Sequence, residues 1–191
     1  MMPVSMHADS AWILKKDRNN IQVFTRAIPD SPYHAAKLIT ELDSDLETVA
    51  KAIGNGQECN AWIKMCKKVT LLEQISPEEM FFYTVLDFPF PLKDRESVLH
   101  VTTQRSHDLK SVTITMQSAD DKYPQQSYIR MVSDITYKIQ DLDNNKVRFT
   151  WFVQSNPGGN VKTSLYNARL PKDTYKDVLR LRNLLQSGKA N

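Results

Sequence analysis

The sequence predicts an α+β fold in which a curved antiparallel β-sheet wraps around one long C-terminal α-helix. Apolar and polar residues alternate along most of residues 67–154, as they do through Val147, Phe149 and Trp151, and this pattern is typical of strands with one covered face. Apolar residues between 161 and 185 then recur mostly at helical spacing, so the closing helix can supply the cover. The concave face of the sheet and the helix are expected to enclose an apolar cavity.

The first third of the chain predicts three strands and two helices. The strands are expected at 12–15, 21–26 and 34–42. An Asp- and Asn-containing turn separates the first two. Ser44 and Asp45 are candidate N-caps for the first helix, which Gly54-Asn55-Gly56 ends. The second helix is expected from about Gln57 to Cys66.

Six further strands precede the closing helix. They are expected at 67–75, 79–87, 96–104, 110–118, 127–140 and 146–154. The segment from Met80 to Leu86 is apolar on both faces, so we expect the sheet to be covered on each side there. Pro171 is expected to kink the closing helix or to start its second half, because proline lacks the N–H group and disfavours a helical residue before it.

Length and composition suit one globular domain, since 41% of the 191 residues are hydrophobic and 25% are charged. We place this domain at 11–187, between a disordered or processed tail at 1–10 and a short tail at 188–191, and expect a soluble monomer. No run of 18 apolar residues could span a membrane, and the N-terminus holds no complete signal peptide. Met6-His7-Ala8 resembles a processing site, which leaves both a cytoplasmic and a periplasmic or secreted location open.

Several function classes lack their signatures in this sequence. The 25 basic and 22 acidic residues give a net charge of +3 and are spread along the chain, so no basic stripe for nucleic acid is present. The four histidines have no metal-ligand spacing, and the motifs of serine hydrolases, zinc proteases and phosphate-binding loops are missing. We therefore expect no catalytic residue, no metal and no cofactor.

The two cysteines, Cys59 and Cys66, both fall in the second predicted helix. At about 1.5 Å per residue they would lie about 10 Å apart along its axis, beyond the reach of a disulfide bond. The sequence therefore predicts two free, partly buried thiols.

Five stretches of the chain form a combination that is typical of one family. They are Trp12 to Asp17 with Ile21 to Arg26, Trp62 before Val69 to Glu73, Phe88 to Arg95, Tyr128 to Met131, and Gly158 to Val161 with Asn167. Together they resemble the START domain, the steroidogenic-acute-regulatory-protein-related lipid transfer family, in its bacterial single-domain form. The resemblance extends from about residue 11 to residue 185.

This resemblance implies a helix-grip fold that encloses one lipid, sterol, isoprenoid or similar apolar molecule without covalent chemistry. In the family, the loop between the fifth and sixth strands and the C-terminal helix are thought to act as a gate, and this loop is Asp87 to Asp94 here. Its two prolines restrict the backbone while Phe90 and Leu92 present apolar surface, so we expect transient contact with a membrane surface. A stiff turn that buries Phe90 in the core is the alternative.

Some family members hold the ligand's polar head with an acid–base pair. The matching positions here fall near Phe82 or Tyr83 and near His100 or Val101, so the pair is absent and a mostly apolar ligand is expected. Tyr83 and His100 stay candidates for one hydrogen bond to a hydroxyl or carbonyl group, with a satisfied core histidine as the alternative. The candidate ligand-binding residues are Phe82, Tyr83, Val85, Phe90, Leu92, Arg95, His100, Met116, Trp151, Val153, Leu165 and Asn167.

Two arginines need polar partners because a guanidinium in a half-buried sheet must find a carboxylate or a carbonyl. Arg95, beside Asp94 and Glu96, is expected to tie down the gate loop, with contact to a lipid headgroup as the alternative. By strand parity Arg130 points away from its apolar neighbours, which favours a structural role.

Two other function classes stay open. A cyclase-, aromatase- or hydrolase-like enzyme of related helix-grip fold could use His100 with Tyr83 for proton transfer. An interaction protein would have a filled cavity and would bind its partner at the outer strand edges. An open apolar cavity of roughly several hundred Å³ would favour lipid binding over that last alternative.

Overall fold

The computed structural model describes residues 11–56 and 59–188, so the predicted tail at 1–10 and residues 189–191 lie outside the described residues. The strands are β1 (Ile13–Arg18), β2 (Ile21–Ile28), β3 (Ser31–Leu42), β4 (Cys66–Ser76), β5 (Glu79–Leu86), β6 (Arg95–Arg105), β7 (Ser111–Ser118), β8 (Ile129–Arg130), β9 (Val132–Asp141) and β10 (Val147–Asn156). The α-helices are α1 (Leu46–Gly54), α2 (Cys59–Trp62) and α3 (Thr163–Gln186).

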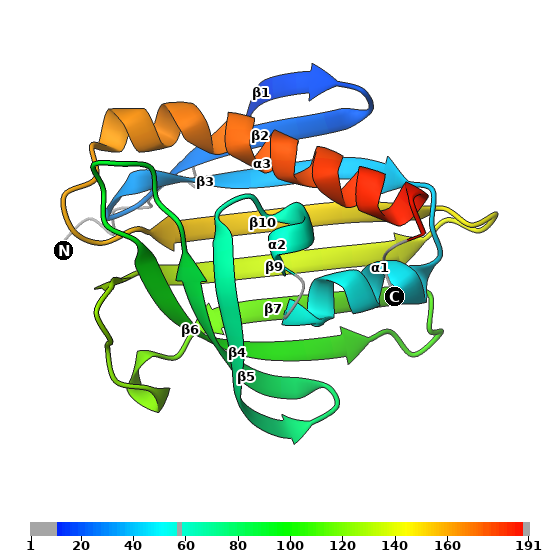
Figure 1. Ribbon diagram of the computed structural model, residues 1–191. Coiled ribbons are helices and arrows are strands. Elements are labelled where there is room, and N and C mark those ends of the chain that lie inside the picture. Colours follow the sequence, from blue (N-terminus) through cyan, green and yellow to red (C-terminus); the bar gives the residue numbers. More distant parts are fainter. Residues whose placement is uncertain (1–10, 57–58, 189–191) are drawn as a thin grey trace, which may run out of the picture.

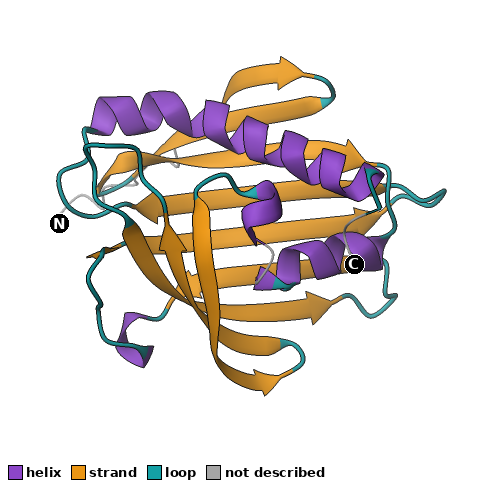
Figure 2. Ribbon diagram, viewed as in Figure 1, coloured by secondary structure: helices purple, strands orange, loops and turns teal. Residues whose placement is uncertain are grey.

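These strands form one curved sheet in the order β1-β2-β3-β10-β9-β7-β6-β5-β4, while the short β8 pairs with β6 off this path (Figure 1). All neighbours are antiparallel except β6 and β8. The long α3 crosses one face of the sheet, and α1 and α2 lie on the same side (Figure 2). The predicted α+β fold, a curved antiparallel sheet around a long C-terminal helix, is therefore confirmed.

Local sequence explains the first elements. The turn between β1 and β2 is made by Asn19 and Asn20, whose φ angles of 55° and 56° suit the short polar side chains that the sequence places there. Asp45 caps α1, because its side chain accepts a 2.9 Å hydrogen bond from the backbone N–H of Thr48. The apolar stripe of α1, which includes Val49 and Ile53, is buried against the sheet.

The segment after α1 departs from the prediction. The expected helix from Gln57 to Cys66 is only the single turn Cys59–Trp62, and residues 57 and 58 lie outside the described part of the chain. The chain then reverses, so that Cys66 begins β4 instead of continuing a helix. This reversal brings the two cysteine Cα atoms to 5.9 Å and joins the cysteines in a disulfide bond. The prediction of free thiols is therefore wrong.

The strand β5 is covered on both faces, as its composition predicted. Phe82 faces the main core between the sheet and the helices. Tyr83 and Val85 face the other way, into a small second cluster beneath Tyr123 and Tyr128. The second face is thus closed by the segment between β7 and β8, which folds back over the outside of the sheet.

Two further elements differ in detail from their predictions. The single strand expected at 127–140 is divided into β8 and β9, because the backbone N–H of Met131 donates a hydrogen bond to the carbonyl of Glu96. The helix α3 continues through Pro171, so the proline does not start a separate helix. Asn167 in its second turn accepts a hydrogen bond from the N–H of His34 and donates one to the carbonyl of Pro32, which fastens α3 to β3.

Candidate functional site

A cavity of ≈ 240 Å³ lies between the concave face of the sheet, α3 and the segments that surround α2 and follow β5. Most of its wall is apolar. The apolar lining includes Ile53, Trp62, Val69, Phe82, Leu86, Phe88, Leu92, Leu99, Met116, Met131, Ile135, Tyr137, Trp151, Val153, Val161, Leu165 and Leu170. A cavity of this size is slightly below the usual range of about 300–1,000 Å³ for small-molecule sites and suits one compact apolar ligand.

Strand register explains how the sheet builds this wall. Trp151 of β10 lies opposite Leu38 of β3 on one side and opposite Tyr137 of β9 on the other. Two residues further along, Val153 and Ile135 form the next such pair. Because side chains alternate between the faces of a strand, both rows point to the concave side.

Two groups of polar side chains in the wall have clear hydrogen-bond partners. Ser133 and Ser155 lie side by side on β9 and β10, with their hydroxyl oxygens 2.9 Å apart. The side chain of Tyr166 of α3 is hydrogen-bonded to Ser155, and burial raises the pKa of this tyrosine to about 12. Further along α3, Asp177 accepts hydrogen bonds from the backbone N–H of Lys64 and from Arg180, at 3.1 and 2.7 Å.

Burial of Asp177 raises its pKa to about 6, because removal from water disfavours the charged carboxylate. Its hydrogen bond from Lys64 and the charge of Arg180 oppose this effect only in part. At neutral pH the carboxyl is ionised, so it places a negative charge beside the apolar chamber.

The cavity opens where the loop after β5 meets the start of α3. Leu165 lines the cavity and is nevertheless 52% exposed, so this part of the wall reaches the surface. Pro89, Leu92 and Val161 line the same end, which we call the mouth. Phe90, in the same loop, is 97% exposed, which contradicts its burial in a stiff turn.

Arg95 ties the two sides of the mouth together. Its side chain is only 1% exposed and donates hydrogen bonds to the carbonyls of Pro157 and Gly158, at 2.9 and 3.1 Å, and to the carbonyl of Lys93. Gly158 is required here, since it has a φ of +62° and a Cβ atom would lie 2.5 Å from the Arg130 carbonyl. The expected role of Arg95 in holding the loop is thus visible in its contacts, and backbone carbonyls are the partners.

Sequence comparison agrees with this architecture, because the family model described as "START domain" matches residues 6–191. The chain belongs to the START domain family. Members of this family bind lipids or other hydrophobic ligands. No helix within residues 11–56 and 59–188 is long and apolar enough to cross a membrane.

Known proteins resemble this START domain in sequence and in fold. An uncharacterized protein of Pseudomonas aeruginosa is 27% identical over 173 residues, which are 87% of this chain and 84% of that protein. A STAR-related lipid transfer protein from Xanthomonas axonopodis is 22% identical with a TM-score of 0.83, covering 92% of this chain and 98% of the other. Human StAR-related lipid transfer protein 5 is 13% identical with a TM-score of 0.86, covering 96% and 90%. At these identities the two structures show the fold.

Half of the predicted ligand-binding residues lie on the cavity wall of this START domain. They are Phe82, Leu92, Met116, Trp151, Val153 and Leu165. The other six are not among the described lining residues: Tyr83, Val85, Phe90, Arg95, His100 and Asn167. Strand parity explains why Tyr83 and Val85 do not line the cavity: Phe82 and Thr84 of the same strand take the inward positions, so their neighbours point outward. His100 stacks on Phe81 and contacts Glu79 at 2.8 Å, away from the wall.

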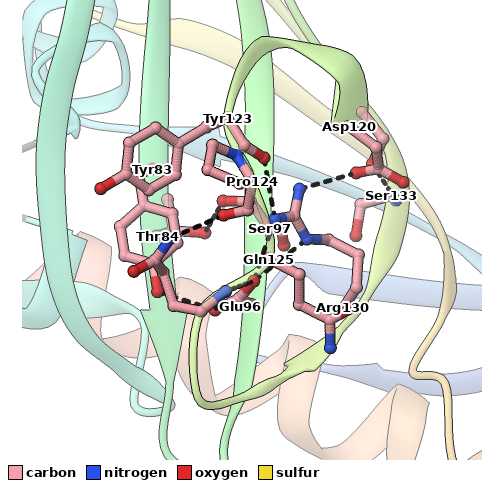
Figure 3. Close-up of polar contacts among 12 residues, drawn as sticks. Tyr83, Thr84, Glu96, Ser97, Asp120, Tyr123, Pro124, Gln125, Arg130 and Ser133 are labelled. Carbon is pink, nitrogen blue, oxygen red and sulfur yellow. Dashed lines mark hydrogen bonds and ion pairs between the residues drawn. The ribbon is translucent and has the colours of Figure 1, made fainter.

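Tyr83 and Arg130 belong instead to a polar network on the outer side of the sheet (Figure 3). Its centre is the fully buried Glu96, which accepts a 2.8 Å hydrogen bond from the Tyr83 hydroxyl and a 2.9 Å bond from Arg130. The backbone N–H of Gln126 donates to the same carboxylate at 3.0 Å. Arg130 also reaches Asp120 at 3.3 Å. The network fastens the segment between β7 and β8 to the sheet, so the structural role expected for Arg130 agrees with its contacts.

Among the lining residues that sequence reasoning missed are Trp62, Tyr137 and Asp177. Tyr137 could have been found from parity, since it alternates in phase with Ile135 and Ile139, which face the core. Asp177 gave no such signal, because an acidic residue in a helix is usually solvent-exposed.

Proposed function

We propose that this START domain binds one lipid-like, mainly apolar molecule in its cavity and carries it without chemical change. The observation that supports this proposal is the apolar chamber of ≈ 240 Å³ between the sheet and α3. A protein whose only task was to present its outer strands to a partner would have no need of such a chamber, because a filled core is more stable.

Catalysis finds less support in the same chamber. The candidate proton-transfer pair was His100 with Tyr83, but these residues lie away from the described wall, with Glu79 and Glu96 as their respective partners. Tyr137, which does line the wall, has its pKa raised by burial and by the charge of Asp177. It is therefore a poor base at neutral pH.

Native mass spectrometry of the purified protein, followed by organic extraction, tests the carrier function. One copy of a lipid, sterol, isoprenoid or similar molecule per chain is expected, with an unchanged structure after release. A product that differs from the molecule supplied to the ligand-free protein would contradict the non-catalytic role.

The proposal includes exchange at a membrane surface through the mouth. Phe90 is almost fully exposed, and Leu165 is half-exposed on α3 at the same opening. Lys93 and Lys162 are exposed next to these segments, so the apolar tip carries positive neighbours. Apolar side chains that enter the headgroup region beside basic residues are typical of membrane-surface contacts.

Transfer of a fluorescent lipid between vesicles that contain anionic lipid tests this contact. Phe90→Asp is expected to slow transfer about tenfold while it leaves the free energy of unfolding unchanged, because the side chain is solvent-exposed. Leu109→Asp is the matched control, since Leu109 is 66% exposed in the turn after the opposite end of β6. Equal transfer rates for the two variants would refute the contact.

We further propose that the protein works in an oxidising compartment, because the Cys59–Cys66 disulfide closes the loop beside the cavity. Such bonds persist outside the reducing cytosol. Rapid alkylation of freshly lysed cells without reductant checks this: protected cysteines are expected, and full labelling of both thiols would contradict it.

A further inference from the structure

The hydroxyl of Tyr137 lacks a partner from the protein. Tyr137 lines the cavity and is only 1% exposed, yet its hydroxyl makes no hydrogen bond with any residue in the described ranges. The hydroxyl is not among the atoms that are both sealed from solvent and unpaired, so it borders the cavity and can donate to whatever occupies it. Phenylalanine would fill the same space without a donor, and the oxygen of Tyr137 therefore needs an explanation.

The ring that carries this hydroxyl is held by aromatic neighbours. It is stacked on Trp151, its cross-strand partner, with ring centroids 5.6 Å apart, and Trp62 meets it edge-on at 6.1 Å. Phe149 lies on the strand position next to Trp151 on the same face, and its centroid is 5.9 Å from the tyrosine ring. Because these contacts orient the ring, the hydroxyl occupies a defined place in the wall.

A second donor without an acceptor belongs to the neighbouring residue. The indole Nε1 of Trp151 is buried and has no hydrogen-bond acceptor among the described residues. Trp151 and Tyr137 are neighbours in strand register, and both side chains line the cavity. Because the Nε1 atom itself is sealed from solvent, the Tyr137 hydroxyl is the donor that the cavity offers to an oxygen atom.

The helix α3 brings a negative charge to the same wall. Asp177 lines the cavity, and its carboxylate raises the pKa of the Tyr137 hydroxyl in addition to the effect of burial. The tyrosine is therefore protonated, and able to donate, at every physiological pH. An anionic group placed here would be repelled by Asp177, whereas a neutral oxygen would not.

We propose that Tyr137, with Trp151 and Asp177 around it, forms a polar subsite that binds a neutral hydroxyl or carbonyl oxygen of an otherwise apolar ligand. This inference rests on the proposed carrier function and narrows its ligand class. The subsite lies away from the mouth, since Asp177 follows Leu165 by twelve positions, or about 18 Å along α3. The ligand thus enters with its oxygen-bearing end first.

Three near-isosteric probes test the subsite by calorimetric titration of the delipidated protein: acetophenone, ethylbenzene and benzoate. Tyr137→Phe is expected to weaken acetophenone binding about 3- to 10-fold and to leave ethylbenzene binding within twofold, because only the ketone can accept the hydrogen bond. Benzoate is expected to bind at least tenfold more weakly than acetophenone. The ligand-free variant is expected to be at least as stable as the wild type, since it loses an unpaired hydroxyl.

Tyr83→Phe is the matched control. The Tyr83 hydroxyl donates to Glu96 on the outer side of the sheet, so its loss is expected to lower stability without a change in the affinity of any probe. Equal losses of acetophenone and ethylbenzene binding in Tyr137→Phe would overturn the subsite, as would tight benzoate binding. If acetophenone and ethylbenzene bind the wild type equally well, the subsite fails and the carrier function stands. If none of the three probes binds the wild type, both the polar subsite and the carrier function fail.

Discussion

Two adjacent residues, Arg95 and Glu96, are both fully buried and have opposite charges, yet they do not pair with each other. Successive residues of a strand point to opposite faces, so Arg95 reaches carbonyls near the mouth while Glu96 turns to Arg130 on the outer side. Arg95 is stabilised by hydrogen bonds to backbone carbonyls, whereas Glu96 forms an ion pair with Arg130 and accepts further hydrogen bonds from Tyr83 and Gln126.

Breaking the outer pair is expected to be costly. Arg130→Met leaves the Glu96 carboxylate buried without its cation, and a loss of about 3–5 kcal/mol in the free energy of unfolding is expected from urea denaturation. Arg148→Met is the control, because Arg148 and Glu41 form an exposed pair that contributes less than about 1 kcal/mol. The double variant Glu96→Gln with Arg130→Met should recover part of the loss, and a double variant as unstable as the sum of the singles would contradict this explanation.

Asp177 is expected to make stability fall as the pH rises through the mildly acidic range. Its pKa is about 6 in the folded protein against 3.8 as its ordinary value, so between pH 4 and 6 the folded state holds a proton that the unfolded chain releases. The destabilisation is complete above about pH 6, reaches about 1–3 kcal/mol, and vanishes below about pH 4. The charges that face this carboxyl are Arg180, Lys64 and Asp173.

Urea denaturation of the wild type and Asp177→Asn between pH 4 and 7 measures this contribution. Asparagine can still accept the hydrogen bond from Lys64 but cannot ionise, so the difference between the two proteins isolates the carboxyl. Carboxyls with lowered pKa, such as Asp94 beside Lys67, make stability rise with pH instead. Their contribution is the same in both proteins, so it cancels in the difference between the two free energies of unfolding. A pH-independent difference would contradict the prediction.

At the scale of elements, the disulfide is the main local feature that periodicity hid. The stretch from Cys59 to Cys66 carries apolar residues at spacings that a longer helix would also show, but the helix ends at Trp62. Trp62 is buried and meets both Tyr137 and Trp151 edge-on, and this tertiary contact favours the reversal of the chain over further helix.

Reduction of the Cys59–Cys66 bond is expected to lower the free energy of unfolding by about 2 kcal/mol, because a short closed loop restricts the unfolded chain. Thermal unfolding with and without a reductant measures the effect. Cys59→Ser with Cys66→Ser serves as the control, since the double variant should show the lower midpoint in both buffers and no response to the reductant.

Elements with strong alternation or clear caps could be predicted from the sequence, and the cavity wall only in part. The capped α1 and the strands β5, β6 and β10 lie where the pattern of apolar residues placed them. The inward direction of Phe82 rather than Tyr83 could not be read, because both faces of β5 are apolar. Asp177 faces the chamber only because α3 crosses the sheet at one particular angle, which local sequence does not encode.

At the scale of the whole molecule, the first and last thirds of the chain meet in one sheet. β10 pairs with β3, more than a hundred positions earlier, and α3 then crosses β3 and β2. Both walls of the chamber therefore exist only in the folded state, so a bound ligand stabilises the fold through the difference in its affinity for folded and unfolded protein.

Removal of any co-purified ligand is accordingly expected to lower the thermal midpoint by several degrees. At a ligand concentration a thousand times the dissociation constant, the stabilisation is about 4 kcal/mol, and the midpoint should rise with added extract in proportion to the logarithm of its concentration. Trp151→Ala should abolish most of this response, because Trp151 forms part of the chamber wall. An unchanged midpoint after extraction would contradict the prediction.

The contacts of Arg95 also have a kinetic consequence. The Arg95 guanidinium is hydrogen-bonded to Lys93 on one side of the opening and to Pro157 and Gly158 on the other. Outward movement of either segment therefore breaks hydrogen bonds to Arg95. Widening should therefore happen as one activated event instead of a gradual loosening. Ligands of different affinity would then dissociate with similar half-times that depend steeply on temperature, because opening of the protein and not the ligand sets the rate.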